Sequence, residues 1–444
     1  MMYTIPIYSN DPWLINFIKS INPSFTTIQL KNASRICQGL LSSMDHKSIA
    51  SIAEALVEAR DQSSLNRFLN ESNWGLNPWE MDANRIKVMQ RYKQTSFTSR
   101  GSIVIDDSLL AKSGKAMDLV HPHFDHCSFV MQPGLSLVTT NYSDDAKNYN
   151  LLKEAYLRKE YLEHLGASDQ FKTKIKIATE FIEKIVETVP SVLAQKPTFL
   201  FDSWFLSKPV VGTLKKYELK YVSRAKSNRI IVGLHMNLKE YADTVLKPTA
   251  FKEITIQSVR APESLFAYTA ILPISNLGDV KVVFVKNELN GPVKAYLVSN
   301  DLKRSGTEII EAYKARWPIE TDYKNNKQYL GLSEFHLRKK EGILRYLTLC
   351  FLTSTYLEYC RLMGIFGHSF GKRVDLSSKG KEVRAYQHLM FERFLIWLDY
   401  QFSQEKNLYD LMRFFRDEAT HCIDAIQFVH QSTLSSLIIE GGGM

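Results

Sequence analysis

The chain has 444 residues, of which 45% are apolar and 23% charged, so its composition excludes a mainly disordered or fibrous protein. Its length predicts two or more packed units. The 5 cysteines include no Cys-x-x-Cys pair, which argues against a disulfide framework and suits a reducing compartment. A net charge of +9 favours an anionic partner such as nucleic acid, and a merely basic enzyme is the alternative.

Residues 1–100 carry mainly helical patterns. Apolar residues recur at helical spacing over residues 49–57 and 65–69, and Asn77-Pro78 interrupts the pattern before it resumes. These helices are expected to form either a DNA-binding bundle or simple packing. The N-terminus lacks the pattern of a secretory signal, and the longest apolar segment, residues 344–360, carries charges that a membrane span would exclude. We therefore expect a soluble cytoplasmic protein.

Two short apolar runs end in acidic residues. Residues 102–107 read Ser-Ile-Val-Ile-Asp-Asp, and residues 198–202 read Thr-Phe-Leu-Phe-Asp. Each run predicts a buried strand that delivers a carboxylate at its C-terminal end. Acids at strand ends also serve as helix caps or turn formers, so the two runs do not by themselves define a site.

Strand and helix patterns alternate along the rest of the chain. Residues 129–140 predict a hairpin that turns at Pro133-Gly134, and residues 170–188 predict an amphipathic helix. Short β-type runs between residues 229 and 298, separated by Gly, Asn and Pro, predict a β-rich segment. Helical patterns return near residue 306 and continue toward the C-terminus.

Four polar residues near residue 320 recur at helical spacing. Tyr313, Arg316, Glu320 and Lys327 fall within one stripe about 60° wide on a helix. Such a column suits a metal-held phosphodiester, with the acid for the cation and the other groups for phosphates. A solvated helix face with an Arg316–Glu320 pair is the alternative. Pro318 removes a helix hydrogen bond, so either two helical pieces share the stripe or Pro318 opens a new helix.

The order Tyr-x2-Arg-x3-Glu-x6-Lys resembles the signature of DDE transposases of the IS4 type. Residues 105–109 (Ile-Asp-Asp-Ser-Leu), with Lys112 and Gly114, resemble the first-aspartate motif of that family, which usually reads Asp-Asp-Thr. Residues 201–205 (Phe-Asp-Ser-Trp-Phe) resemble its second-aspartate motif, and residues 67–74 resemble the helical region before the core in IS701-like relatives.

The resemblance implies an α/β fold, with an RNase H-like mixed sheet core, a β-rich insertion, and flanking N- and C-terminal helical regions. The first Asp is then expected on the first strand, the second on the fourth strand and the Glu on a later helix. The expected divisions are an N-terminal helical DNA-binding region (1–100), the first part of the catalytic core (101–228), the β-rich insertion (229–290), the second part of the core (291–345) and a C-terminal helical region (346–444).

The resemblance also implies the catalytic residues. It gives Asp107, Asp202 and Glu320 as ligands of two Mg²⁺ or Mn²⁺ ions, because hard divalent cations prefer oxygen ligands. Asp106 is the alternative to Asp107, since adjacent strand residues face opposite ways. By the same resemblance, Tyr313, Arg316 and Lys327 bind phosphates at the transposon end. The weaker site candidates are Lys112, Trp204 and Arg224.

The implied activity is metal-dependent strand cleavage at transposon ends, followed by strand transfer into target DNA in a cut-and-paste reaction. The implied partners are double-stranded DNA and a second copy of the chain in a synaptic complex. Residues 389–415 would either make the contact between copies or pack on the core. A bacterial cytosolic, nucleoid-associated location follows. The alternative is a catalytically silent, transposase-derived DNA-binding protein or inhibitor, which would have no need of three mutually repelling carboxylates.

A second metal motif competes with this interpretation. Residues 121–126 read His-Pro-His-Phe-Asp-His and fit the HxHxDH run of metallo-β-lactamase-like hydrolases, which could ligate zinc. That fold needs an apolar strand immediately before the motif, and residues 115–120 are a poor one. A polar loop between the first strand and the hairpin is the preferred interpretation, and a zinc hydrolase is a remote alternative.

Overall fold

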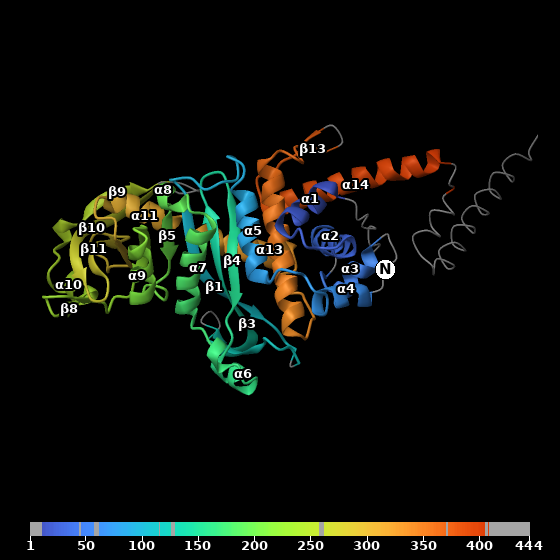
Figure 1. Cartoon of the computed structure of the whole chain (residues 1–444). Helices are drawn as coiled ribbons and strands as arrows, with labels where there is room; N and C mark the ends of the chain where they lie inside the picture. Colours follow the sequence, from blue (N-terminus) through green and yellow to red (C-terminus); the bar gives the residue numbers. More distant parts are fainter. Residues whose placement is uncertain are drawn as a thin grey trace, which may run out of the picture.

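The computed structural model describes residues 11–43, 46–56, 62–114, 116–125, 129–256, 262–369, 372–404 and 407. Its centre is one mixed sheet of 12 strands, with helices packed around it. Figure 1 shows the β-rich segment at one end of the molecule and the N-terminal helices at the other. No helix in the described part has an apolar stretch long enough to cross a bilayer.

Five strands form the core of the sheet, in the order β4-β3-β1-β5-β6. Strand β1 pairs antiparallel with β3 and parallel with β5, while β5 pairs parallel with β6. Three antiparallel strands followed by two parallel ones, reached through helical crossovers, form the RNase H-like arrangement that the sequence predicts. The expected fold class is therefore confirmed. The bounds are β1 Ser102–Ala111, β3 Val130–Ser143, β4 Asn148–Ala155, β5 Thr198–Phe201 and β6 Tyr221–Ala225.

The β-rich segment continues the same sheet. Strand β12 pairs antiparallel with β6, and β11 and β10 follow outward. Its strands are β7 Ile230–Ile231, β8 Met236–Asn237, β9 Lys252–Ile256, β10 Glu263–Ile274, β11 Gly278–Lys286 and β12 Ala295–Ser299, with α10 Leu238–Thr244 between β8 and β9. The strand expected over residues 230–234 is cut short at Ile231. Gly233 and His235 there have positive φ angles, which turn the chain.

The hairpin expected at Pro133-Gly134 is wrong. Strand β3 runs through this pair and lies antiparallel to β2 (His121–Asp125). Strand β2 lies where a polar loop was expected. Pro133 lies opposite Pro122, at the margin of the sheet where a missing N–H is tolerated. Gly134 is required there because an added Cβ would lie 2.7 Å from the Leu110 carbonyl oxygen.

The N-terminal helices begin with strong local signals. Thr26 and Asn77 each form a capping box with the residue three positions later, and Pro78 opens its helix. Helices α2, α4 and α5 pack against α13, whose side chains are buried along most of its length. Their bounds are α1 Pro12–Ile21, α2 Thr27–Ser42, α3 Ile49–Ala55, α4 Gln62–Asn70, α5 Pro78–Met89 and α13 Lys340–Leu362.

Further helices surround the sheet, and α14 extends away from the body (Figure 1). They are α6 Lys159–His164, α7 Lys174–Thr188, α8 Val192–Gln195, α9 Lys208–Lys216, α11 Gly306–Lys314, α12 Trp317–Tyr329 and α14 Lys379–Ser403. Two short strands, β13 His368–Ser369 and β14 Lys372–Arg373, form a separate hairpin. Of the expected inter-copy contact over residues 389–415, the part from residue 408 onward lies outside the described residues.

A buried ionic network fastens the N-terminal helices to the sheet. In α5, Asp82 accepts hydrogen bonds from Arg85 at 2.9 Å and from Lys153 of β4 at 2.7 Å. Arg85 also donates to the Leu151 carbonyl of β4 and to the Thr355 hydroxyl of α13. Buried charges are tolerated when every partner is present, so this network specifies how three elements meet.

Candidate active site

Two neighbouring parallel strands deliver the first two acidic residues. The register pairs Ile105 with Phe201, so the next positions along β1 and β5 are Asp106 and Asp202. The strand side chains that precede them are fully buried, which holds both strand ends in place. The Asp202 carboxylate accepts backbone N–H bonds from Trp204 at 2.9 Å and Phe205 at 3.2 Å. This turn ends β5 and fixes the orientation of the carboxylate.

The signature stripe is divided between two helices. Helix α11 ends at Lys314, and α12 begins at Trp317 with Pro318 in its first turn. Proline is favoured there because its missing N–H would be unpaired in any case. Tyr313 therefore belongs to α11, while Arg316 lies at the junction and Glu320 lies in the first turn of α12.

One open cleft of about 820 Å³ gathers residues from β1, the end of β5 and α12. The acidic residues come from three separate parts of the sequence, and the basic residues come mainly from α12. The lining residues are Asp106, Asp107, Ser108, Asp202, Arg316, Glu320, Tyr323, Lys324, Lys327 and Gln328. The structure therefore brings together both candidate first acids, the second acid, the glutamate and two of the three expected phosphate-binding residues.

Arg316 bridges two of the acids in this cleft. Its Nη1 atom lies 2.7 Å from Oδ2 of Asp106, and its Nη2 atom donates to Oε1 of Glu320. Burial raises the pKa of Asp106 to about 7, although Arg316 opposes this rise, and the nearby Asp202 raises the pKa further. The carboxylates thus repel one another and need a cation to remain ionised together.

Asp107 also lines the cleft, but its carboxylate has a different partner. Its Oδ2 atom lies 2.7 Å from the Lys174 ammonium, which comes from the first turn of α7. Lys174 also lies 5.5 Å from the Tyr156 ring centre. The alternation of the strand therefore places Asp106, not Asp107, beside Asp202 and Glu320. This geometry favours the alternative first acid over Asp107.

The three carboxylates offer the oxygen ligands that Mg²⁺ and Mn²⁺ prefer. In the described ranges, however, no three or more His, Cys, Asp or Glu side chains are grouped closely enough to hold a metal ion. Asp106 and Glu320 instead share the Arg316 guanidinium. The oxygen atoms of these carboxylates are suitable ligands for a divalent cation. The Arg316 guanidinium supplies the positive charge beside Asp106 and Glu320.

The other expected phosphate-binding residues lie at the margin of the cleft. Arg316 lies 6.0 Å from the ring centre of Tyr313, whose burial raises its pKa. The Lys327 ammonium donates to the Ser108 hydroxyl at 3.1 Å and to the Leu109 carbonyl at 3.2 Å. Their contact with DNA remains a prediction.

The weaker candidates fall into different environments. Lys112 donates to the carbonyls of Ser333 at 2.7 Å and Phe335 at 2.6 Å, and burial lowers its pKa to about 8. Lys112 therefore joins the end of β1 to the loop after α12, and a contact between Lys112 and a DNA backbone remains a prediction. Arg224 is exposed on β6 and donates to the Lys294 carbonyl at 3.1 Å.

Trp204 lies beside the second acid with 57% of its surface exposed. Lys226 lies 5.7 Å from its ring centre, and both residues line a pocket of about 550 Å³. Lys208 and Arg229 line the same pocket. Aromatic and cationic side chains together suit a nucleotide, with the ring for a base and the charges for phosphate.

Sequence reasoning missed two residues that line the cleft, Lys324 and Tyr323, and also Lys174, which pairs with Asp107. Lys324 lies one helical turn after Glu320, so continued helical spacing could have identified it. The Tyr323 hydroxyl lies 2.6 Å from the Thr139 hydroxyl and donates to the Asp106 carbonyl at 3.3 Å. Lys174 had no local signal, because it meets Asp107 only through the packing of α7 on the sheet.

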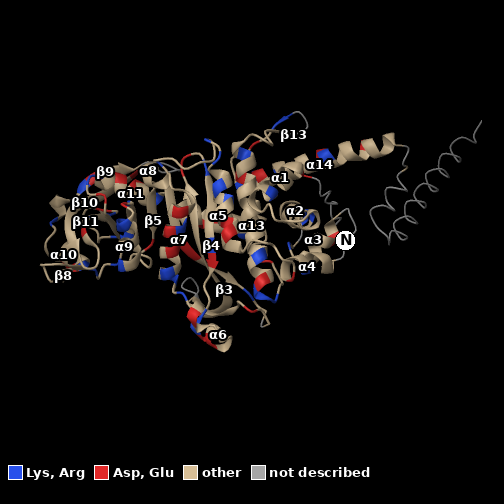
Figure 2. Cartoon of the chain, in the orientation of Figure 1, with Lys and Arg blue, Asp and Glu red and all other residues tan. Residues whose placement is uncertain are grey.

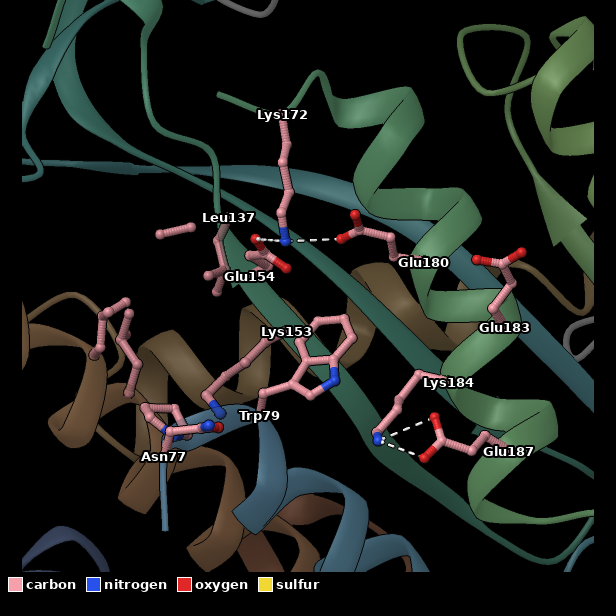
Figure 3. Close-up of a pocket in the computed structure, with 14 residues that line it drawn as sticks. Asn77, Trp79, Leu137, Lys153, Glu154, Lys172, Glu180, Glu183, Lys184 and Glu187 are labelled. Atoms are coloured by element: carbon pink, nitrogen blue, oxygen red, sulfur yellow. Dashed lines mark hydrogen bonds and ion pairs between the residues drawn. The ribbon is translucent and has the colours of Figure 1, made fainter. Parts of the chain in front are cut away.

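A second groove, of about 610 Å³, lies along α7 and contains none of the motif residues. Figure 2 shows the acidic residues that lie along this helix, and Figure 3 shows the groove beside Trp79. Its charges are already paired, since Lys172 meets Glu154 at 3.1 Å and Glu180 at 2.8 Å. We therefore interpret this groove as part of the packing between α7 and the sheet.

The competing zinc motif has no described ligand set. His121 and His123 lie in β2, and burial lowers the pKa of His123 to about 4. The motif's third histidine, His126, lies outside the described residues.

Comparisons with known proteins show the family of the chain. A sequence family described as DDE superfamily endonuclease matches residues 21–245, and the transposase DDE domain matches residues 172–356. No curated protein sequence matches the chain. A cryo-EM structure of the piggyBac transposase synaptic complex with hairpin DNA is similar, with a TM-score of 0.49 and 13% identity over 92% of this chain and 82% of that one. Because the first family covers just over half of the chain, this protein belongs to the DDE superfamily endonucleases, and its residues 172–356 match the transposase DDE domain.

Proposed function

We propose that the protein cleaves the ends of a transposable DNA element and joins them to target DNA, with Asp106, Asp202 and Glu320 as its catalytic carboxylates. One observation carries this proposal: three acids from distant parts of the sequence line one cleft together with Arg316 and Lys324. Asp107 is the alternative first acid. The IS4-type spacing of the signature supports a cut-and-paste reaction.

The carboxylates would hold Mg²⁺ or Mn²⁺, and we expect two ions per site. When bound, such ions activate the attacking oxygen and stabilise the leaving oxygen of an in-line displacement. Two backbone hydrogen bonds fix the orientation of the Asp202 carboxylate, and the Tyr323 hydroxyl donates a hydrogen bond to the backbone carbonyl of Asp106. Lys324 lies on the cleft surface, where its ammonium can bind a phosphate of the DNA strand.

The substrate is double-stranded DNA in this proposal. The net charge of +9 supports such a partner, since basic side chains bind the phosphate backbone. Two DNA ends must be cut and joined together, so we propose that two copies of the chain act in one complex. A bacterial cytosolic location near the nucleoid follows from this substrate.

Incubation with a linear DNA that carries the element's own ends tests the proposal. With Mg²⁺ or Mn²⁺, the wild type should cut at the ends, whereas Asp202→Asn and Glu320→Gln should not. Asp243→Asn is a matched control, because Asp243 is exposed and paired with Lys239. Equal cleavage by Asp202→Asn would overturn the site. Specific binding to the ends without cleavage, with either metal, would favour the catalytically silent DNA-binding protein.

A further inference from the structure

The guanidinium of Arg316 occupies the space between two proposed metal ligands. It reaches Asp106 through Nη1 at 2.7 Å and Glu320 through Nη2. The exposed fractions are 18% for the arginine, 16% for Asp106 and 36% for Glu320, so the three groups meet at the partly buried floor of the cleft. Arginine carries a permanent charge and only donors, so both contacts use carboxylate oxygens as acceptors.

These contacts compete with metal binding. A divalent cation that took these two oxygen atoms would have to displace the guanidinium, and one bound to the other oxygens of the same carboxylates would be repelled by its charge. In the part of the chain that the structure describes, no three acidic side chains are yet grouped to hold an ion. The arginine must therefore move before Asp106 and Glu320 can ligate metal together.

Arg316 lies at the junction of two helices. The residue lies between the end of α11 at Lys314 and the start of α12 at Trp317, so its side chain leaves from a junction and not from the middle of a helix. A DNA phosphate entering the cleft would offer a guanidinium two oxygen acceptors in a matching geometry. Lys324, which lines the same cleft, would help to attract that phosphate.

We propose that Arg316 is an internal counter-ion that couples DNA binding to metal binding. In the DNA-free protein it neutralises Asp106 and Glu320, and in the DNA complex it moves to a phosphate and releases both carboxylates for metal. This inference rests on the proposed function, since it takes the cleft to be the metal site. Coupling between two ligands is reciprocal, so metal must also strengthen DNA binding.

Calorimetric titration of the full chain with Ca²⁺ tests the coupling without cleavage as a readout. Wild type should bind Ca²⁺ weakly alone and at least fivefold more tightly after addition of a linear DNA duplex, with Ca²⁺ binding to the duplex itself subtracted. Arg316→Gln should bind Ca²⁺ at least fivefold more tightly than wild type without DNA, and DNA should change its affinity less than twofold. Lys314→Gln removes a nearby charge that pairs with Glu263 outside the cleft, so it should follow wild type.

A second, milder variant tests the inference in case Arg316→Gln does not fold. Arg316→Lys keeps the charge but offers one ammonium in place of two guanidinium nitrogens, so it should hold the two carboxylates less firmly, and its Ca²⁺ affinity should lie between those of wild type and Arg316→Gln. Weaker or unchanged Ca²⁺ binding by a folded Arg316→Gln would overturn the inference and would show that the arginine orients the ligands. That outcome leaves the proposed function standing. Failure of every variant to bind Ca²⁺, with or without DNA, would overturn both the inference and the metal site.

Discussion

Asp106 of β1 and Asp202, which directly follows β5, line one cleft beside two parallel strands. The pairs Val104–Leu200 and Ile105–Phe201 precede them, so the same register brings the two carboxylates to one face of the sheet, with strands about 4.8 Å apart. Burial raises the pKa of Asp106, and repulsion by the Asp202 carboxylate raises it further. A cation beside the two carboxylates would therefore reduce the repulsion between them.

Substitution of the two adjacent acids in β1 should separate their roles. Asp106→Asn should lower metal-dependent cleavage of DNA ends by about a thousandfold, because a ligand of the reacting centre is lost, which corresponds to about 4 kcal/mol. Asp107→Asn should cost less than about tenfold, because the Asp107 carboxylate pairs with Lys174 and not with Arg316. Rates of cleavage under single-turnover conditions provide the measurement. An inactive Asp107→Asn beside an active Asp106→Asn would restore Asp107 as the first acid.

Trp204→Ala should weaken binding of unpaired bases near the cleavage site. Stacking on an aromatic ring contributes about 1–3 kcal/mol per base, so the affinity for a DNA end with an unpaired 2-aminopurine should fall about 5- to 150-fold. Fluorescence of the 2-aminopurine, which stacking quenches, provides the measurement. Trp13→Ala is a suitable control, because Trp13 is also exposed but lies on α1. Equal quenching by wild type and Trp204→Ala would refute a stacking role.

Asp82→Ala should destabilise the fold strongly. It leaves Arg85 and Lys153 buried without their shared anion, and breaking such a pair costs about 3–5 kcal/mol. Urea denaturation followed by circular dichroism would measure the loss. Asp243→Ala removes an exposed ion pair with Lys239 and should change the free energy of unfolding by less than about 1 kcal/mol. Similar losses in the two variants would show that the buried network contributes no more than a surface pair.

Lys47 should make stability depend on pH above neutrality. Burial lowers its pKa from 10.5 to about 8, so between these values the unfolded chain binds a proton that the folded chain does not. The free energy of unfolding therefore gains a contribution that rises with pH across this window, by up to about 3 kcal/mol. Lys47→Met lacks this contribution.

Urea denaturation at pH 7.5 and pH 10 would test that prediction. The difference in stability between wild type and Lys47→Met should shift in favour of wild type at the higher pH. Lys159→Met is the control, because Lys159 is exposed on α6, and it should keep a constant difference from wild type. A constant difference for Lys47→Met as well would contradict the assignment of Lys47 as a buried, poorly solvated ammonium.

Local patterns predicted much of the fold. The apolar runs before Asp106 and Asp202 are buried strands, and residues 170–188 contain helix α7. The division of the signature at Pro318 was one of two expected arrangements. Pro133-Gly134 misled because a turn dipeptide also fits a strand at the margin of a sheet, where the close approach of another backbone requires glycine.

The sequence by itself determined which residue types end the strands and open the helices, because these depend on neighbours along the chain. It thereby named the acids of the cleft. Only the tertiary structure decided that Asp106 shares a face with Asp202 and that Asp107 meets Lys174. A strand shows its side chains to alternate faces, and the pairing with β5 and the packing of α7 and α12 determine what each face meets. Those contacts join residues far apart in the sequence, so no local pattern records them.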